Sequence, residues 1–240
     1  MSTALITFFV ALSAVLALVA AGVWAANRKL RRAQFIRTYE WPRGLLTKFE
    51  RKSAGVGFKD AALVSRGLRQ FFMAYLMSGQ KYVAMPSQAA DDLWHEFILY
   101  TRDYEQFCKG AFGGLLHHTH AVGLRDGQKR DNEGLRRVWW FACKDENISP
   151  HKPSRMPLLF ALDSKLKIAN GYVYHTDCAS LRRSGASGTQ CTGDFASTSI
   201  DGGTAGFGDF GGDGGSGADS SGGGDSGSSC GGGSCGGGGD

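Results

Sequence analysis

The residues best suited to chemistry lie in one stretch of the chain, residues 86–120. It contains four of the six histidines of the chain together with an acid and a cysteine that could bind metals or transfer protons: Asp91, His95, Cys108, His117, His118 and His120. Imidazole and carboxylate groups are common ligands of zinc and iron in proteins. A turn at Gly113-Gly114 would bring the later histidines back toward His95. The predicted ligands are therefore Asp91, His95, His117 and His118, and the expected metal is zinc or iron.

Two other interpretations of these residues stay open. His95 can be a histidine at the edge of the core that Asp91 orients, with the later histidines in a polar loop. Alternatively, the residues form a metal-free pocket in which a histidine acts as acid or base. The spacing matches no established zinc signature, because the fourth residue after His95 is Leu99 and a His-Glu-x-x-His motif is absent.

An amphipathic helix is needed to position Asp91 and His95. Ser87 is typical of a helix start, and Gly110 or Gly113 is typical of its end. Apolar residues recur between these points at steps of three and four: Ala90, Leu93, Trp94, Phe97, Thr101, Tyr104 and Cys108. The pattern predicts one continuous helix with this stripe in the core. The side chains expected to point away, mostly into water, are Asp92, Glu96, Leu99 and Asp103.

The same stretch carries a resemblance to a known family. Its motifs are D-x-x-W-H-E-F-I at 91–98, Y-x-x-F-C at 104–108 and H-H at 117–118. They resemble an uncharacterised family of bacterial membrane-anchored proteins and, more distantly, the glycine-rich domain-containing proteins. The resemblance covers roughly residues 40–180. It implies a mostly helical domain of unknown activity and assigns no catalytic residue.

A second amphipathic helix is expected before this stretch. Residues 59–77 place these side chains on a buried face: Ala61, Val64, Leu68, Phe71, Phe72 and Tyr75. The residues assigned to its other face are Ser65, Arg66, Arg69 and Gln70. We expect the buried face to pack against Leu93, Trp94 and Phe97.

A third helix is predicted from Asp131 or Asn132 to Cys143, and a fourth over residues 158–168. The inward residues of the third helix are Leu135, Val138, Trp139 and Ala142. Arg136 and Arg137 lie outside this stripe and are predicted to form a solvated face.

An uncharged apolar segment precedes the domain. Residues 4–26 contain no charged side chain and are long enough to cross the hydrocarbon layer of about 30 Å. Four basic residues follow directly: Arg28, Lys29, Arg31 and Arg32. The positive-inside rule places the N-terminus outside and the body in the cytoplasm. A cleaved signal peptide is the alternative, although it favours a charged start and a shorter apolar core.

Charge and glycine are unevenly distributed. Of the 36 glycines, 21 lie from Gly193 onward, and residues 192–240 have seven Asp and no Lys or Arg. The first 191 residues therefore carry a net charge of +12. Basic bodies attract acidic membranes or nucleic acid. Because the basic residues lie beside the anchor, the membrane is the expected partner and no nucleic acid is expected.

The cysteines are expected to be free thiols in a reducing cytoplasm. Cys108 and Cys143 fit the core as small apolar side chains. His175, Cys178 and Cys191 are a second, weaker candidate for a metal set, because no C-x-x-C accompanies them.

These patterns predict an all-α protein with a small helical bundle. The expected parts are a transmembrane anchor at 1–27, a basic juxtamembrane stalk and domain entry at 28–57, a helical domain at 58–183 and a disordered Gly/Ser/Asp-rich tail at 184–240. An anchor, a bundle and a flexible tail favour a membrane-tethered binding or scaffold module, with protein partners held by the helical domain or the tail. A metal- or histidine-dependent enzyme acting near the membrane is the alternative function.

Overall fold

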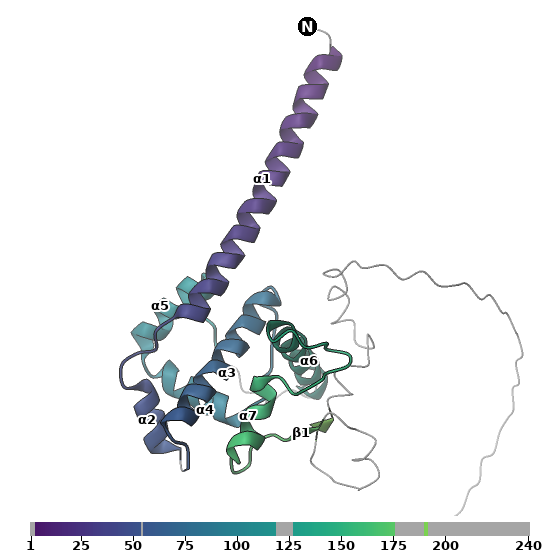
Figure 1. The fold of residues 1–240 in the computed structure, drawn as a ribbon. Coiled ribbons are helices and arrows are strands. Elements are labelled where there is room, and N and C mark those ends of the chain that lie inside the picture. The colour runs from purple at the N-terminus through teal and green to yellow at the C-terminus, as the bar shows by residue number, and fades with distance from the viewer. Residues whose placement is uncertain (1–2, 54, 119–126, 176–189, 192–240) are drawn as a thin grey trace, which may run out of the picture. The chain divides into compact units, whose positions relative to one another are not determined.

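The computed structural model describes residues 3–53, 55–118, 127–175 and 190–191, and this part of the chain is all-α, as predicted (Figure 1). Its seven helices are α1 Thr3–Thr38, α2 Leu45–Lys52, α3 Phe58–Met77, α4 Gln88–Ile98, α5 Thr101–Phe112, α6 Gly127–Asp145 and α7 Leu158–Leu166. The two-residue strands β1 (Tyr174–His175) and β2 (Gln190–Cys191) pair in parallel. Apart from β2, the tail at 184–240 lies outside the described residues, so its disorder stays a prediction.

Helix α3 lies at the centre of the helical domain. It contacts α1, α2, α4, α6 and α7. The face predicted to be buried is buried except for Tyr75, which is partly exposed. Phe71 and Phe72 pack against Trp94 with ring centroids 5.1 and 5.8 Å apart. Ser65 and Gln70, which were assigned to the other face of this helix, are buried as well, because α6 and α7 cover that side of α3.

Helix α1 enters the domain without a break. Its N-terminal part is exposed and apolar, and α1 is long and apolar enough to cross a membrane, a property it shares with N-terminal signal sequences. Near its other end, Ala33 and Ile36 are buried in the core. Arg69 of α3, assigned to the face opposite the buried stripe, donates to the carbonyl of Ile36 at 2.8 Å and to that of Tyr39. Helix α3 therefore fixes the end of α1.

The stretch predicted as one helix is two helices, α4 and α5, which meet at Leu99 and Tyr100. Phe97 and Phe107 explain the break. Ten residues apart in a straight helix, they would lie about 15 Å apart along the axis, yet their ring centroids are 5.5 Å apart. The bend allows both helices to bury their aromatic side chains in the same core.

Helix α4 is capped partly by a distant helix. Ser87 accepts a hydrogen bond from the backbone N–H of Ala90, as its predicted role as the N-cap requires. In addition, the buried carboxylate of Asp163 on α7 accepts from the Ser87 hydroxyl and from the N–H groups of Gln88 and Ala89 at 2.7–3.1 Å. Helix α7 therefore fixes the first turn of α4.

Helix α2 was not expected from the sequence, and it changes the environment of Glu96. Predicted to point into water, the Glu96 side chain is 2% exposed. It forms ion pairs with Lys52 and, at 2.9 Å, with Lys48 of α2. Hydrogen bonds from these two lysines hold the pKa of Glu96 below its usual value. The apolar residues Leu45 and Phe49 complete the contact of α2 with the core.

The predicted inward face of α6 is confirmed, but the start of the helix and one arginine differ from the prediction. Helix α6 begins at Gly127, before the predicted cap at Asp131 or Asn132, and ends at Asp145. Leu135, Val138, Trp139 and Ala142 are all buried. Arg137, predicted to be solvated, is 9% exposed; it pairs with Glu133 at 3.0 Å and donates to the carbonyl of Tyr82 at 2.8 Å. The segment that leads into α4 covers this arginine, and periodicity within α6 gives no sign of that segment.

Candidate metal site

Helix α4 holds the first two predicted ligands one turn apart. Asp91 and His95 are separated by four residues, so their side chains lie on the same side of the helix. His95 Nδ1 is 3.5 Å from Asp91 Oδ2. This pairing is the one that the sequence pattern predicts.

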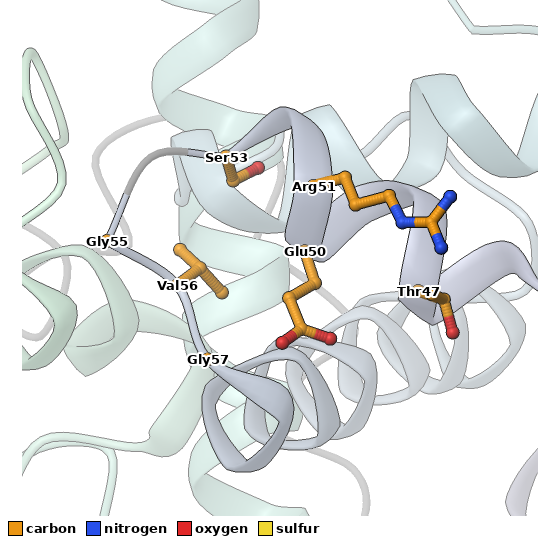
Figure 2. A pocket seen from close by; sticks show the side chains of 7 residues that line it. All are labelled: Thr47, Glu50, Arg51, Ser53, Gly55, Val56 and Gly57. Carbon is orange, nitrogen blue, oxygen red and sulfur yellow. The ribbon is translucent and has the colours of Figure 1, made fainter.

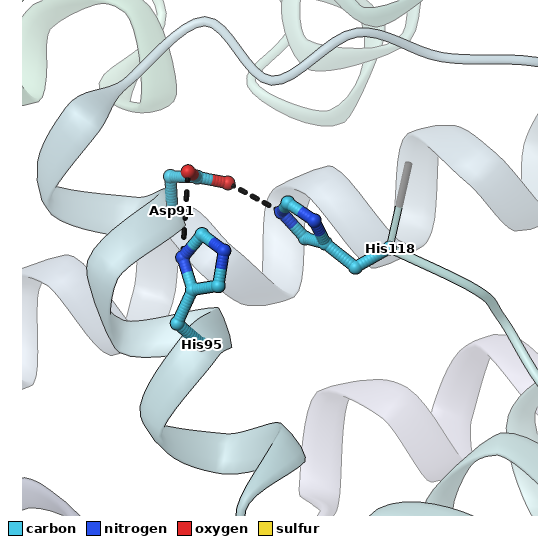
Figure 3. A group of neighbouring side chains, drawn as sticks. All are labelled: Asp91, His95 and His118. Carbon is cyan, nitrogen blue, oxygen red and sulfur yellow. Dashed lines mark hydrogen bonds and ion pairs between the residues drawn. The ribbon is translucent and has the colours of Figure 1, made fainter. Parts of the chain in front are cut away.

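His118 reaches the same carboxylate from the segment after α5 (Figure 3). Its Nε2 atom is 2.8 Å from Asp91 Oδ1. The ring of His118 lies 4.2 Å from the ring of His95 and packs edge-on against Trp94, with 4.4 Å between the centroids. The turn after α5 thus returns a histidine to α4, as expected.

A buried tyrosine holds the segment that carries His118. The hydroxyl of Tyr104 donates to the backbone carbonyl of Leu116 and accepts from Trp94 Nε1 at 3.2 Å. Burial raises the pKa of Tyr104 far above its usual value, so the hydroxyl keeps its proton. This bond fixes the backbone two residues before His118.

The three side chains fit a divalent transition-metal ion. One potential ligand atom from each of Asp91, His95 and His118 lies within 4.8 Å of the others. Ligands about 2.0–2.1 Å from a tetrahedral ion are roughly 3.4 Å apart. The widest separation in this group therefore has to shrink by at most about 1.4 Å for all three atoms to reach one ion. Two imidazoles and one carboxylate form the protein ligand set of many zinc and iron(II) sites. The side chains are 12–38% exposed, which leaves a path for an ion and for water.

The fourth predicted ligand, His117, and the other metal-binding side chains considered from the sequence do not join this group. His117 is exposed and does not belong to this group, and His120 lies outside the described residues. Cys108 is fully buried, where desolvation raises the pKa of its thiol. In the weaker second set, His175 is exposed, whereas Cys178 lies outside the described residues.

The sequence also matches a known family. A family model described as UCP032817-like matches residues 31–195. The chain belongs to the UCP032817-like family. The matched region includes α2 to α7 and all three clustered residues. No curated protein and no solved structure matches the chain. The more distant resemblance to the glycine-rich domain-containing proteins stays a prediction.

This UCP032817-like protein has a separate surface pocket in the loop between α2 and α3 (Figure 2). Its volume is about 660 Å³, and its lining is Thr47, Glu50, Arg51, Ser53, Gly55, Val56 and Gly57. None of the three clustered residues contributes to it. The sequence gives no sign of this pocket, because α2, which supplies one wall, was not expected.

Proposed function

We propose that this UCP032817-like protein binds one zinc or iron(II) ion through Asp91, His95 and His118. The observation that carries the proposal is the convergence of two imidazoles on the two oxygens of one carboxylate. A histidine at the edge of a core needs only one orienting partner. Here a second histidine arrives from another segment, and a tyrosine fixes that segment.

A metal at this site would support hydrolytic chemistry. Three protein ligands leave a coordination position open for water or substrate. A zinc ion lowers the pKa of bound water to about 7 and so supplies a nucleophile at neutral pH. We therefore propose a metal-dependent hydrolase that acts near the membrane.

Metal content tests this proposal directly. We expect the purified full-length chain to retain about one equivalent of zinc or iron, measured by mass spectrometry. His95→Ala and His118→Ala should each lower the affinity at least tenfold, because two protein ligands hold transition metals weakly. His117→Ala is the matched control and should leave the affinity unchanged. Absence of metal from the wild-type chain under metal-replete conditions would contradict the proposal.

We propose further that α1 anchors the protein as a single span, with the N-terminus outside and the helical domain in the cytoplasm. The basic residues Arg28, Lys29, Arg31 and Arg32, which follow the apolar segment, support this orientation. A reporter enzyme fused after Asp240 should show cytoplasmic activity. Loss of the N-terminal segment from the mature protein would show instead that it is a signal sequence.

The pocket between α2 and α3 favours a second candidate function, the membrane-tethered binding module. Its exposed Arg51 and half-buried Glu50 offer charges of both signs to a partner protein. If this function is correct, Arg51→Glu should alter the set of proteins that cross-link to the chain in intact membranes. An unchanged set in Arg51→Glu and in a chain lacking residues 192–240 would contradict it.

A further inference from the structure

The continuity of α1 defines which end of the helical domain faces the membrane. Lys29 of α1 donates to the carbonyl of Met77, the last residue of α3, at 3.2 Å. The guanidinium group of Arg32 lies over Gly113, directly after α5. The C-terminal ends of α3 and α5 are therefore level with residues 29–32 of α1, on the side from which the apolar part of α1 projects (Figure 1).

Helix geometry gives the distance of the C-terminal ends of α3 and α5 from the hydrocarbon layer of the membrane. The uncharged segment stops at Ala26, and each helical residue adds 1.5 Å, so Lys29 and Arg32 lie about 5–9 Å beyond it along the axis. The headgroup region adds roughly 5–8 Å to each side of the hydrocarbon layer. If the uncharged segment fills that layer, the loops after α3 and α5 reach the phospholipid headgroups.

The side chains at this end suit an acidic membrane surface. Residues 27–39, 77–84 and 106–118 contain no Asp or Glu. Their basic residues are Arg28, Lys29, Arg31, Arg32, Arg37, Lys81 and Lys109. Of these, Lys109 is paired with Glu105 and Arg37 with Asp145 of α6, whereas Arg28, Arg31 and Lys81 are exposed. Leu115, in the loop after α5, is 50% exposed.

We propose that this end of the domain binds the headgroups of acidic phospholipids. The contact surface, here called the membrane rim, consists of residues 79–81 and 113–115 together with Arg28 and Arg31. The arginines and Lys81 attract lipid phosphates, and the Leu115 side chain lies against the glycerol region. The inference depends on the proposed anchoring by α1 and is independent of the proposed metal site.

Hydrogen exchange of the full-length chain in lipid nanodiscs tests the rim. The two lipid compositions are phosphatidylcholine alone and phosphatidylcholine mixed with phosphatidylglycerol. We expect amides at 79–81 and 113–115 to exchange on the order of tenfold more slowly in the acidic nanodiscs, since each basic group near such a surface contributes to attraction. The loop at 55–58 belongs to no rim segment and should exchange equally in both.

Matched substitutions identify the residues responsible. Leu115→Asp and Lys81→Glu should each remove most of the added protection. Leu99→Asp, at the opposite end of α5 and 63% exposed, is the control and should retain it. Equal exchange in both lipids, or an equal effect of Leu99→Asp, would overturn the inference. Failure of the chain to insert into nanodiscs would instead contradict the proposed anchoring by α1. The metal content of the same samples tests the metal site separately.

Discussion

At the scale of single residues, Asp91 connects the two histidines of the candidate site. Its Oδ2 atom faces His95 on the same helix, and its Oδ1 atom contacts His118 from another segment. The position of His118 depends in turn on Tyr104, which binds the carbonyl of Leu116. The metal affinity should therefore depend on a residue that is not itself a ligand.

Tyr104→Phe tests this dependence. Removing the hydroxyl frees the backbone before His118, and loss of such an outer partner typically weakens metal binding by 10–100-fold. We expect about a tenfold lower zinc affinity in a competition titration, with the helical content unchanged. Tyr39→Phe is the control, because it removes a comparable tyrosine–carbonyl bond, to Asp103, away from the site. Equal affinities of Tyr104→Phe and the wild type would show that Tyr104 does not position His118.

At the scale of secondary structure elements, helix ends in this domain are satisfied by side chains from other helices. Asp163 of α7 accepts from the first turn of α4. In the same way, Glu146 at the end of α6 accepts from the N–H of Leu158, and Gln70 of α3 accepts from that of Leu159. Because unpaired N–H groups at a helix start are costly when buried, these bonds order α4 and α7 only when the helices pack together.

The substitution Asp163→Asn measures how much the hydrogen bonds between Asp163 and the first turn of α4 contribute to stability. The amide keeps the shape but replaces an acceptor oxygen with a donor that faces other donors in a buried site. We expect the free energy of unfolding to fall by about 2 kcal/mol, seen as a melting temperature lower by roughly 5 °C. Asp92→Asn, exposed on α4, should have almost no effect. A melting temperature for Asp163→Asn equal to that of Asp92→Asn would contradict the proposed role of Asp163.

The contact between α2 and α4 should make stability depend on pH. Lys52 and Lys48 lower the pKa of Glu96 in the folded state, whereas an unfolded Glu titrates near 4.3. The charged pair therefore stabilises the fold above about pH 4.3, and this contribution is lost as the pH falls through the lower folded pKa. Melting temperatures measured from neutral to acidic pH should fall less steeply in Glu96→Gln, which should already be less stable at neutral pH. If the melting temperatures of the wild type and Glu96→Gln fell equally steeply with pH, Glu96 would be excluded as a source of the pH dependence of stability.

At the scale of the whole molecule, α1 and the helical domain are joined through Arg69. Its guanidinium group binds carbonyls at the end of α1 and lies 4.8 Å from the centre of the Trp41 ring. Burial lowers the pKa of Arg69 below its usual value, yet an arginine stays charged at any physiological pH. This side chain therefore fixes the direction in which α1 leaves the domain.

Arg69→Ala should loosen that junction. We expect the free energy of unfolding to fall by about 2 kcal/mol, because several carbonyls lose a charged donor. Amides of residues 37–41 should exchange faster, as measured by mass spectrometry. Arg66→Ala, exposed one turn earlier on α3, is the matched control. Unchanged exchange at 37–41 in Arg69→Ala would show that α1 is held by its apolar contacts alone.

Most helices of this protein follow from local sequence patterns. Periodic apolar residues predicted α3, α6 and α7 because helical spacing is a property of neighbouring residues. The four-residue separation of Asp91 and His95 likewise required no knowledge of the fold. The sequence did not predict α2, and it gave α4 and α5 as one helix. It placed Glu96 and Arg137 in solvent, and Arg69 opposite the buried stripe, because the segments that cover them are distant in the chain.

The amino-acid sequence by itself determined the all-α class, the apolar N-terminal helix and the Asp91–His95 pair. The tertiary structure decided where the helix from residue 88 breaks, since contacts such as Phe97 with Phe107 form only when two helices share a core. It also decided which of two adjacent histidines faces Asp91. In an extended segment neighbouring side chains point to opposite sides, so only one of them can turn inward, and the bond from Tyr104 to Leu116 selects His118.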